Sequence, residues 1–294
     1  MTRVLCVGSA VVDFIFSFDE LPDRAEKFVA KSADIVGGGI AANAAVAISR
    51  LGGEAYLAAQ LGDDTTGELV RKDLKAEGVD LSLVTQTENA RSSYSSVYIN
   101  DVGERQIANY RGENLRFDSA KLEHAPRFNA VLVDTRLPAA AIAALKLARI
   151  QNVPGIVDGE APIDQAILVE ASHVAFSEQG IQSLYPDVSP AEAVQLAATE
   201  YQVWAAVTDG QNGVWFSDAG VVSHVPAFSV AVVDTLGAGD VWHGAFALAL
   251  AEGQSEIESV RFANAVAALK CTRPGGRAGA PTRAELDNFL KGRV

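Results

Sequence analysis

The chain has 294 residues, 49% hydrophobic and 21% charged, as expected for a soluble globular protein with one large domain, with or without a subdomain. A net charge of −13 and a pI near 4.8 argue against nucleic acid or an anionic membrane as the main partner. The two cysteines, Cys6 and Cys271, have no metal-ligand spacing and fit a reduced compartment. Without a signal peptide or an apolar run of transmembrane length, we expect a cytoplasmic protein.

Short apolar runs alternate with helical patterns along most of the chain. In chain order, the sequence predicts strand 4–7, helix 40–51, strand 55–60, helix 66–77, strand 130–134, helix 139–150, strands 155–158 and 173–176, helix 190–201, strand 203–208, and helices 240–251, 257–269 and 283–290. This alternation is typical of a parallel sheet covered on both faces. The sequence therefore predicts an α/β fold.

Two stretches, 14–33 and 91–110, break this rhythm because they alternate apolar and polar residues. The second predicts a hairpin around Asp101–Gly103. Together they predict a small antiparallel sheet, either a lid that closes over substrate and excludes water or a dimerisation sheet; one sheet can serve both purposes. We therefore expect a main domain of residues 1–12, 37–90 and 111–294, and a β lid of residues 13–36 and 91–110.

The segment from Asp234 to Asp240 reads Asp-Thr-Leu-Gly-Ala-Gly-Asp, between a predicted strand at 230–233 and a helix. Such a glycine turn directs backbone N–H groups and the positive end of the helix dipole toward one point, which suits a phosphoryl group. Asp240 is then placed to take a proton from an attacking hydroxyl, as in a small-molecule kinase. The alternative is that Asp240 is only a helix N-cap, and that Gly237 and Gly239 only permit a tight turn.

Two motifs resemble the ribokinase-like (PfkB) family of sugar kinases: residues 37–52, beginning Gly-Gly-Gly-Ile-Ala-Ala-Asn, and residues 234–246. The resemblance spans nearly the whole chain. It implies a three-layer α/β/α domain with a small β-sheet lid, a sugar hydroxyl as acceptor, and ATP with Mg²⁺.

The same resemblance implies roles for individual residues. Asp240 would be the general base, and the amides of Gly237, Ala238 and Gly239 the anion hole. Sugar hydroxyls would be held by Asp13, Gly38, Gly39 and Asn43. Nucleotide contacts would come from Thr208, Gly210, Gly213 and Asn264.

The chain departs from the family at one place. Many members carry an Asn-x-x-Glu motif associated with Mg²⁺ and phosphate, but here Ser177 and Gly180 stand at its ends. We therefore assign no metal ligand. The loop with Arg273, Gly275 and Arg277 is open to two interpretations, a monovalent-cation loop or a nucleotide contact.

A closer resemblance, carried by residues 259–279, 175–178 and Lys27, is to the sulfofructose kinases of sulfoglycolysis. These enzymes phosphorylate 6-deoxy-6-sulfofructose at its C1 hydroxyl with ATP. The resemblance implies a sulfonate pocket of Lys27, Asn109 and Arg136, and a monoanion with three acceptor oxygens suits such donors. The alternatives are a solvated lid charge for Lys27, an ion pair with Asp134 or Asp158 for Arg136, and an edge-strand polar residue for Asn109.

These observations lead to the hypothesis of a sulfofructose 1-kinase that is a homodimer through its lid. The alternatives are a kinase for fructose, fructose 6-phosphate, ribose or a nucleoside, and a non-catalytic module that binds sugar or nucleotide. His243 lies one turn beyond Asp240. We expect it to be a core side chain rather than part of a catalytic His–Asp pair.

Overall fold

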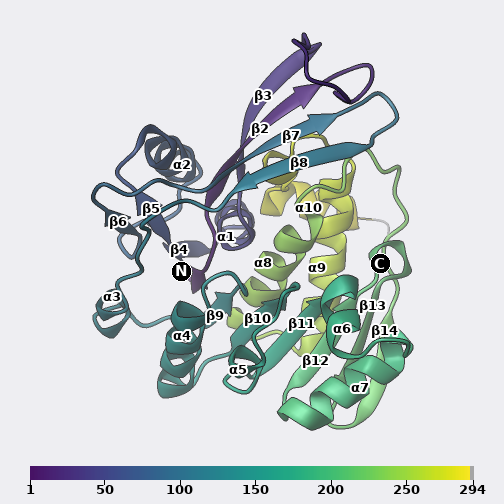
Figure 1. Cartoon of the computed structure of the whole chain (residues 1–294). Helices are drawn as coiled ribbons and strands as arrows, with labels where there is room; N and C mark the ends of the chain where they lie inside the picture. Colours follow the sequence, from purple (N-terminus) through teal and green to yellow (C-terminus); the bar gives the residue numbers. More distant parts are fainter. Residues whose placement is uncertain (292–294) are drawn as a thin grey trace.

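The computed structural model describes residues 1–291, and its centre is an eight-stranded sheet (Figure 1). Its strands are β1 (Arg3–Val7), β4 (Glu54–Ala58), β9 (Ala130–Val133), β10 (Gly155–Gly159), β11 (His173–Ser177), β12 (Trp204–Thr208), β13 (Val214–Asp218) and β14 (Val221–Val225). They lie in the order β14-β13-β12-β11-β10-β9-β1-β4. The pairs from β4 to β12 are parallel, whereas β13 and β14 add an antiparallel edge.

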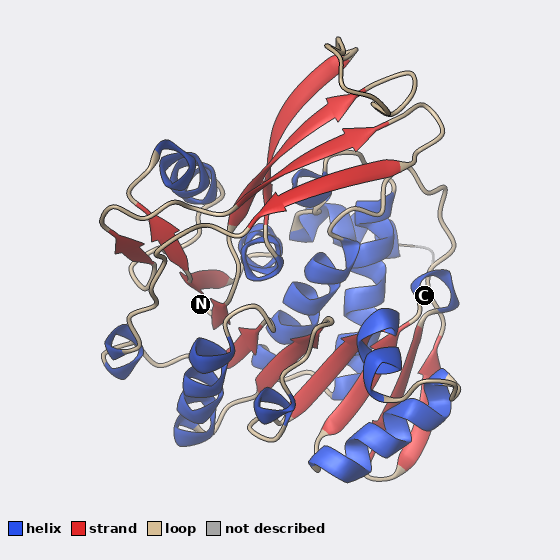
Figure 2. Ribbon diagram, viewed as in Figure 1, coloured by secondary structure: helices blue, strands red, loops and turns tan. Residues whose placement is uncertain are grey.

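Helices cover both faces of this sheet (Figure 2). One face packs against α1 (Ile40–Arg50), α8 (Ala238–Ala251) and α9 (Glu256–Cys271), and α10 (Arg283–Leu290) packs on α9. The other face packs against α4 (Pro138–Gln151), α5 (Gln165–Leu168), α6 (Glu178–Leu184) and α7 (Pro190–Tyr201). Successive residues of β1 serve both layers: Val4 and Cys6 face the first, Leu5 and Val7 the second. The predicted three-layer α/β/α fold is confirmed.

The remaining elements lie beside the β4 edge. They are β5 (Gln60–Gly62), α2 (Thr65–Ala76), β6 (Thr85–Thr87) and α3 (Ala120–Glu123). Two short 3₁₀ turns, η1 (Gly210–Asn212) and η2 (Gly276–Gly279), follow β12 and α9. No helix in residues 1–291 is both long enough and apolar enough to span a membrane.

A second sheet of four strands projects from the main body (Figure 1). It contains β2 (Val11–Ser17), β3 (Ser32–Gly38), β7 (Tyr94–Ile99) and β8 (Arg105–Tyr110), in the order β3-β2-β7-β8. The predicted hairpin is β7–β8. The expectation of a wholly antiparallel sheet is wrong, because the central strands β2 and β7 pair in parallel. Both strands leave the main body in the same direction, so they meet side by side.

The predicted lid boundaries at 13 and 36 fall inside continuous strands. The strand β2 already begins at Val11 and β3 runs on to Gly38, so the same two strands belong to the projecting sheet and to its base. The division into a kinase domain and a lid stays a prediction.

The strand expected at 230–233 is absent, and the chain is irregular there. Val232 and Val233 are 63% and 61% exposed. The large sheet ends at β14, so this apolar run finds no strand beside it, and Val233 N–H instead donates to the carbonyl oxygen of Cys271.

Candidate active site

The helix α8 begins at Ala238, after Gly237 in the left-handed conformation with φ of 70°. A residue with a side chain is strained there, which explains glycine at this turn. Gly237, Ala238 and Gly239 all line one cavity together with Asp240. The amide of Ala238 is already used, because it donates to Thr235 O at 3.1 Å. Of the three amides in the expected anion hole, those of Gly237 and Gly239 are therefore the better candidates.

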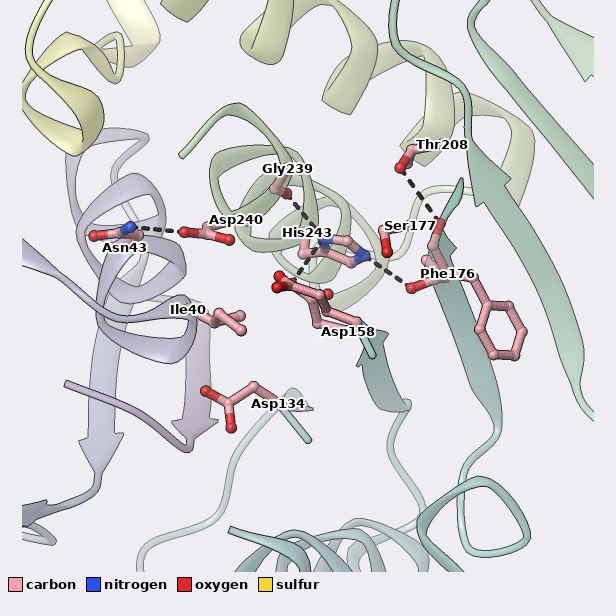
Figure 3. Close-up of polar contacts among 12 residues, drawn as sticks. Ile40, Asn43, Asp134, Asp158, Phe176, Ser177, Thr208, Gly239, Asp240 and His243 are labelled. Atoms are coloured by element: carbon pink, nitrogen blue, oxygen red, sulfur yellow. Dashed lines mark hydrogen bonds and ion pairs between the residues drawn. The ribbon is translucent and has the colours of Figure 1, made fainter. Parts of the chain in front are cut away.

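The carboxylate of Asp240 is held by a residue from a distant part of the chain. Asn43 Nδ2 of α1 donates to Asp240 Oδ2 at 2.6 Å (Figure 3). Burial, together with the nearby charges of Asp158 and Glu160, raises the pKa of Asp240 to about 7, against the lowering effect of Asn43 and His243. A carboxylate with a pKa near neutral pH suits a general base, because it is both available and basic enough to accept a proton.

A cavity of about 1070 Å³ is lined by residues of the projecting sheet, of α1, of the segments that follow β9 and β10, and of the start of α8. The predicted site residues that line it are Asp13, Gly39, Asn43, Asn109, Arg136, Gly237, Ala238, Gly239 and Asp240. The predicted residues outside its lining are Lys27, Gly38, Thr208, Gly210, Gly213 and Asn264. The expected sugar and catalytic residues thus come together largely as one group.

Asp13 of β2 faces this cavity from the base of the lid. Burial raises its pKa, against the effect of a hydrogen bond to Ser95 and the charge of Arg277. Gly38 pairs with Val11 in the register between β3 and β2, two residues before Asp13, and a Cβ atom on Gly38 would clash with the Asp13 carboxylate. Gly38 therefore leaves room for Asp13 rather than lining the cavity itself.

Arg136 forms an ion pair, but with a carboxylate other than Asp134 and Asp158, the two partners considered from the sequence. Its Nη2 lies 2.8 Å from Glu160 Oε1, and its Nη1 donates to Ala161 O at 2.9 Å. Asp134, by contrast, accepts from the backbone N–H of Arg136 and from Ser9. Arg136 thus lines the cavity within a fixed ion pair.

Sequence reasoning missed three charged residues that line the cavity, Glu160, Asp164 and Arg111. Within the described residues, no hydrogen bond or ion pair engages the Arg111 guanidinium. One signal for Arg111 was available. It follows the predicted strand 105–110 two residues after Asn109, and residues two apart in an extended segment face the same side.

Lys27 lies exposed in the loop between β2 and β3. Asn109, on β8, lines the cavity and donates from Nδ2 to Ser95 Oγ at 3.1 Å. The structure therefore brings two of the three expected sulfonate ligands to the cavity, and the role of Lys27 stays a prediction.

The expected nucleotide residues lie apart from the cavity. Thr208 ends β12 beside Ser177 of β11. Asn264 is buried, with Oδ1 accepting from Trp242 Nε1 at 2.8 Å and Nδ2 donating to Pro226 O at 3.2 Å. Asn264 therefore joins α8 to α9 through its side chain, and its contact with a nucleotide stays a prediction.

The departure at Ser177–Gly180 has a structural explanation. Ser177 caps α6 by accepting the N–H of Gly180 at 3.0 Å. A Cβ atom on Gly180 would overlap the carbonyl oxygen of Gly159, so no glutamate fits at this position. No group of three or more His, Cys, Asp or Glu side chains in residues 1–291 is arranged to hold a metal ion. We accordingly assign no Mg²⁺ ligand.

The loop considered for a monovalent cation is occupied by the protein's own donors. The backbone N–H groups of Gly275 and Gly276 both donate to Asp234 Oδ2, at 3.0 and 3.2 Å. The fully buried Lys270 places its ammonium 2.8 Å from Asp234 O. The two N–H groups and the ammonium are hydrogen-bond donors rather than the oxygen ligands that a cation needs, so the residues present do not fit a cation here.

A buried carboxylate at the entry of a helix, beside a glycine turn and inside a large polar cavity, defines a small-molecule phosphotransferase. The model of the pfkB family carbohydrate kinases matches residues 1–283. Ribokinase of Bacillus subtilis is 30% identical over 297 residues, covering 99% of this chain and 100% of the relative. The ATP-dependent ribose-1-phosphate kinase of Halopiger xanaduensis is 31% identical, covering 100% and 99%.

A solved structure agrees with these matches. The structure of Arabidopsis thaliana ribokinase complexed with ribose and ATP has a TM-score of 0.87 at 26% identity, and the match covers 99% of this chain and 98% of that one. The chain therefore belongs to the pfkB family of carbohydrate kinases and is an ATP-dependent phosphotransferase.

Proposed function

We propose that this protein phosphorylates the C1 hydroxyl of 6-deoxy-6-sulfofructose with ATP and Mg²⁺. The observation that carries the proposal is that one cavity holds both Asp240 and the polar group Asn109, Arg111 and Arg136. A sugar with a reactive hydroxyl at one end and an anionic group at the other could place the hydroxyl at Asp240 and the anionic group at this polar group. Asp13 and Asn43, which line the same cavity, are placed to hold hydroxyls between them.

In the proposed reaction, Asp240 accepts the proton of the C1 hydroxyl as its oxygen bonds to the γ-phosphorus of ATP. The bond between that phosphorus and the β,γ-bridging oxygen breaks, and ADP leaves. The amides of Gly237 and Gly239, at the positive end of α8, stabilise the negative charge on the transferred group. Mg²⁺ enters with the nucleotide and neutralises phosphate charge when bound.

The charges around the polar group favour a monoanion. Arg111 and Arg136 carry two positive charges, and Glu160 cancels one of them through its ion pair with Arg136. Asp164 also lines the cavity, and its Oδ1 accepts the N–H of Ala166. Of the two arginines, Arg111 alone has no ion pair among the described residues, and its single unpaired charge suits a sulfonate better than the dianion of a phosphate. Asn109 adds an amide donor in the same cavity. A neutral sugar has no use for the unpaired guanidinium of Arg111.

The alternative within the family is another sugar. The Bacillus subtilis and Arabidopsis thaliana relatives are named ribokinases, and the Halopiger xanaduensis relative is named for ribose 1-phosphate. Ribose, fructose and fructose 6-phosphate are therefore the substrates to compare. A non-catalytic binding module is disfavoured by the intact Asn43–Asp240 contact.

The test is steady-state phosphorylation of these four sugars with ATP and Mg²⁺. We expect kcat/KM for 6-deoxy-6-sulfofructose to exceed that for each other sugar at least a hundredfold, about 2.7 kcal/mol in transition-state binding. Comparable activity on another sugar contradicts the sulfonate assignment and leaves the kinase assignment standing.

A substitution links this preference to the cavity. We expect Arg111→Met to lower kcat/KM for the sulfosugar by about tenfold or more, because it removes the unpaired guanidinium, and to leave kcat/KM for fructose unchanged. Arg116→Met, at an exposed residue outside the cavity lining, is the control. Lys27→Met in the same assay tests the lid lysine. Equal losses on both sugars would show that Arg111 has no role in anion recognition.

We further propose that two copies pair through their projecting sheets. The edge strands β3 and β8 expose Ile35 and Ile107, which are 61% and 62% accessible. Apolar side chains on unpaired edge strands favour association. Light scattering with size exclusion is expected to give a dimer for the wild type and a monomer for Ile35→Lys/Ile107→Lys. Ile150→Lys, at an 82% exposed position on α4, is the control and should stay dimeric. A monomeric wild type at tens of micromolar contradicts the proposal.

A further inference from the structure

A buried ion pair that the sequence analysis did not predict lies near Asp240. His243 is on α8, one turn after Asp240, and Asp158 is on β10 (Figure 3). His243 Nδ1 lies 3.0 Å from Asp158 Oδ2, and the two side chains are only 2% and 4% exposed. His243 is thus a core residue, as expected, but it is also paired with a carboxylate other than Asp240.

The surroundings of the imidazole fix its protonation state. Nε2 lies 2.9 Å from the carbonyl oxygen of Ala175, and Nδ1 lies 2.8 Å from that of Gly239 as well as near Asp158. Carbonyl and carboxylate oxygens only accept hydrogen bonds, so both ring nitrogens must donate. Only the imidazolium has two N–H groups. Burial by itself lowers the pKa of His243, but Asp158 and the two carbonyl groups raise it to about 9.

This positive charge stands next to the group of carboxylates around Asp240. Asp158 and Glu160 act on Asp240 from β10 and from the segment after it, His243 from its own helix, and Asn43 from α1. Asp134, at the end of β9, is a further buried carboxylate that feels the charge of Asp158. In buried surroundings charges are weakly screened. An uncompensated Asp158 would therefore favour the protonated form of Asp240, which cannot act as a base.

We propose that His243 is a positioning residue that cancels the charge of Asp158 and so keeps Asp240 in the ionised form that accepts the substrate proton. The inference rests on the proposed role of Asp240 as general base. A purely structural role, in which His243 only fastens α8 to β10 and β11, is the competing explanation.

The two explanations differ in the pH dependence of kcat/KM, measured with whichever sugar the enzyme turns over fastest. The pair carries no net charge in the wild type, one negative charge in His243→Gln, and none in His243→Gln/Asp158→Asn. We expect the acid limb of His243→Gln to move to higher pH by about one unit, and that of the double variant to return close to the wild-type position. His173→Gln is the control, because His173 lies at the opposite, amino-terminal end of β11.

Either of two results would overturn the proposal. In one, the acid limb of His243→Gln stays at the wild-type pH. In the other, the double variant keeps the shift of the single variant. If His243 only holds the helix in place, its loss leaves the acid limb where it is, or shifts it by distorting the site. In the second case Asp158→Asn cannot restore the profile.

A second measurement does not depend on activity. The chain has four histidines, so a variant with His124, His173 and His224 replaced by glutamine retains His243 alone. Its ¹⁵N imidazole shifts are expected to be those of an imidazolium at pH 7.5. A neutral ring at that pH overturns the proposal even if the substituted enzymes above fail to fold. If Asp240 proved not to be the base, Asp240→Asn would stay active while this spectrum stayed unchanged, so the two failures are distinguishable.

Discussion

Asp240→Asn is expected to lower kcat about 10³-fold, because asparagine cannot accept the proton of the attacking hydroxyl. The change is nearly isosteric, and the asparagine oxygen still accepts the 2.6 Å hydrogen bond from Asn43. Sugar and nucleotide binding should therefore change little. Single-turnover kinetics, with calorimetric binding of each ligand, separate the loss in the chemical step from any loss in binding.

The matched control for this prediction is Glu178→Gln, which also removes one carboxylate. Glu178 lies exposed on α6 and bonds only Gln182 among the residues described. We expect its kcat to stay within about twofold of wild type, as for most exposed substitutions. Near-normal turnover by Asp240→Asn would remove the general base from the mechanism.

The second large effect is expected at Gly244, where the helices α1 and α8 cross closely. A Cβ atom on Gly244 would lie 2.5 Å from the backbone oxygen of Ala44. Gly244→Val is therefore expected to lower the free energy of unfolding by about 3 kcal/mol, through overpacking. Because Asn43 precedes Ala44 and Asp240 lies one turn before Gly244, the same change should separate Asn43 from Asp240 and lower kcat. Thermal and urea unfolding measure the first effect.

Gly239→Ala on the same helix provides the contrast. Apart from its chain neighbours and the adjoining backbone of α8, no atom lies within 4 Å of a Cβ built on Gly239, and alanine is the better helix former. Unfolding experiments should show this variant to be as stable as the wild type or slightly more so. If Gly244→Val were equally stable, the close crossing would not be the reason for glycine at this position.

Much of the main domain could be predicted because its signals are local. Buried strands appear as short apolar runs, and helices such as α7 begin with Pro190 after a Ser189 cap. The run at 230–233 has the same local pattern, and only its place beyond the last strand of the sheet excludes it. The parallel pairing of β2 with β7 was hidden for a similar reason, since pairing depends on how two distant segments leave the main body.

The candidate site also has a part that the sequence predicts and a part that it does not. Asp240 and its glycine turn form one continuous motif, so their role in phosphoryl transfer could be predicted from the sequence. The partners of the charged side chains are not. Arg136 pairs with Glu160, which is 24 residues away, and His243 Nε2 bonds a carbonyl oxygen 68 residues away. Those partners follow from the order of strands β9, β10 and β11, which no local pattern specifies.

The strands β2 and β3 run without a break from the projecting sheet to the base of the cavity. This continuity affects how mutations can change the enzyme's substrate specificity. Residues that would recognise the far end of the sugar stand on β8, just after it, and beyond β9, whereas the groups for phosphoryl transfer stand on α1 and α8. Mutations can therefore accumulate in the first set without disturbing the second. Two residues are exceptions. Asp13 lies on β2, a strand common to both regions, and Arg136 is paired with Glu160, whose charge acts on Asp240. Replacing either residue would alter substrate range and turnover together.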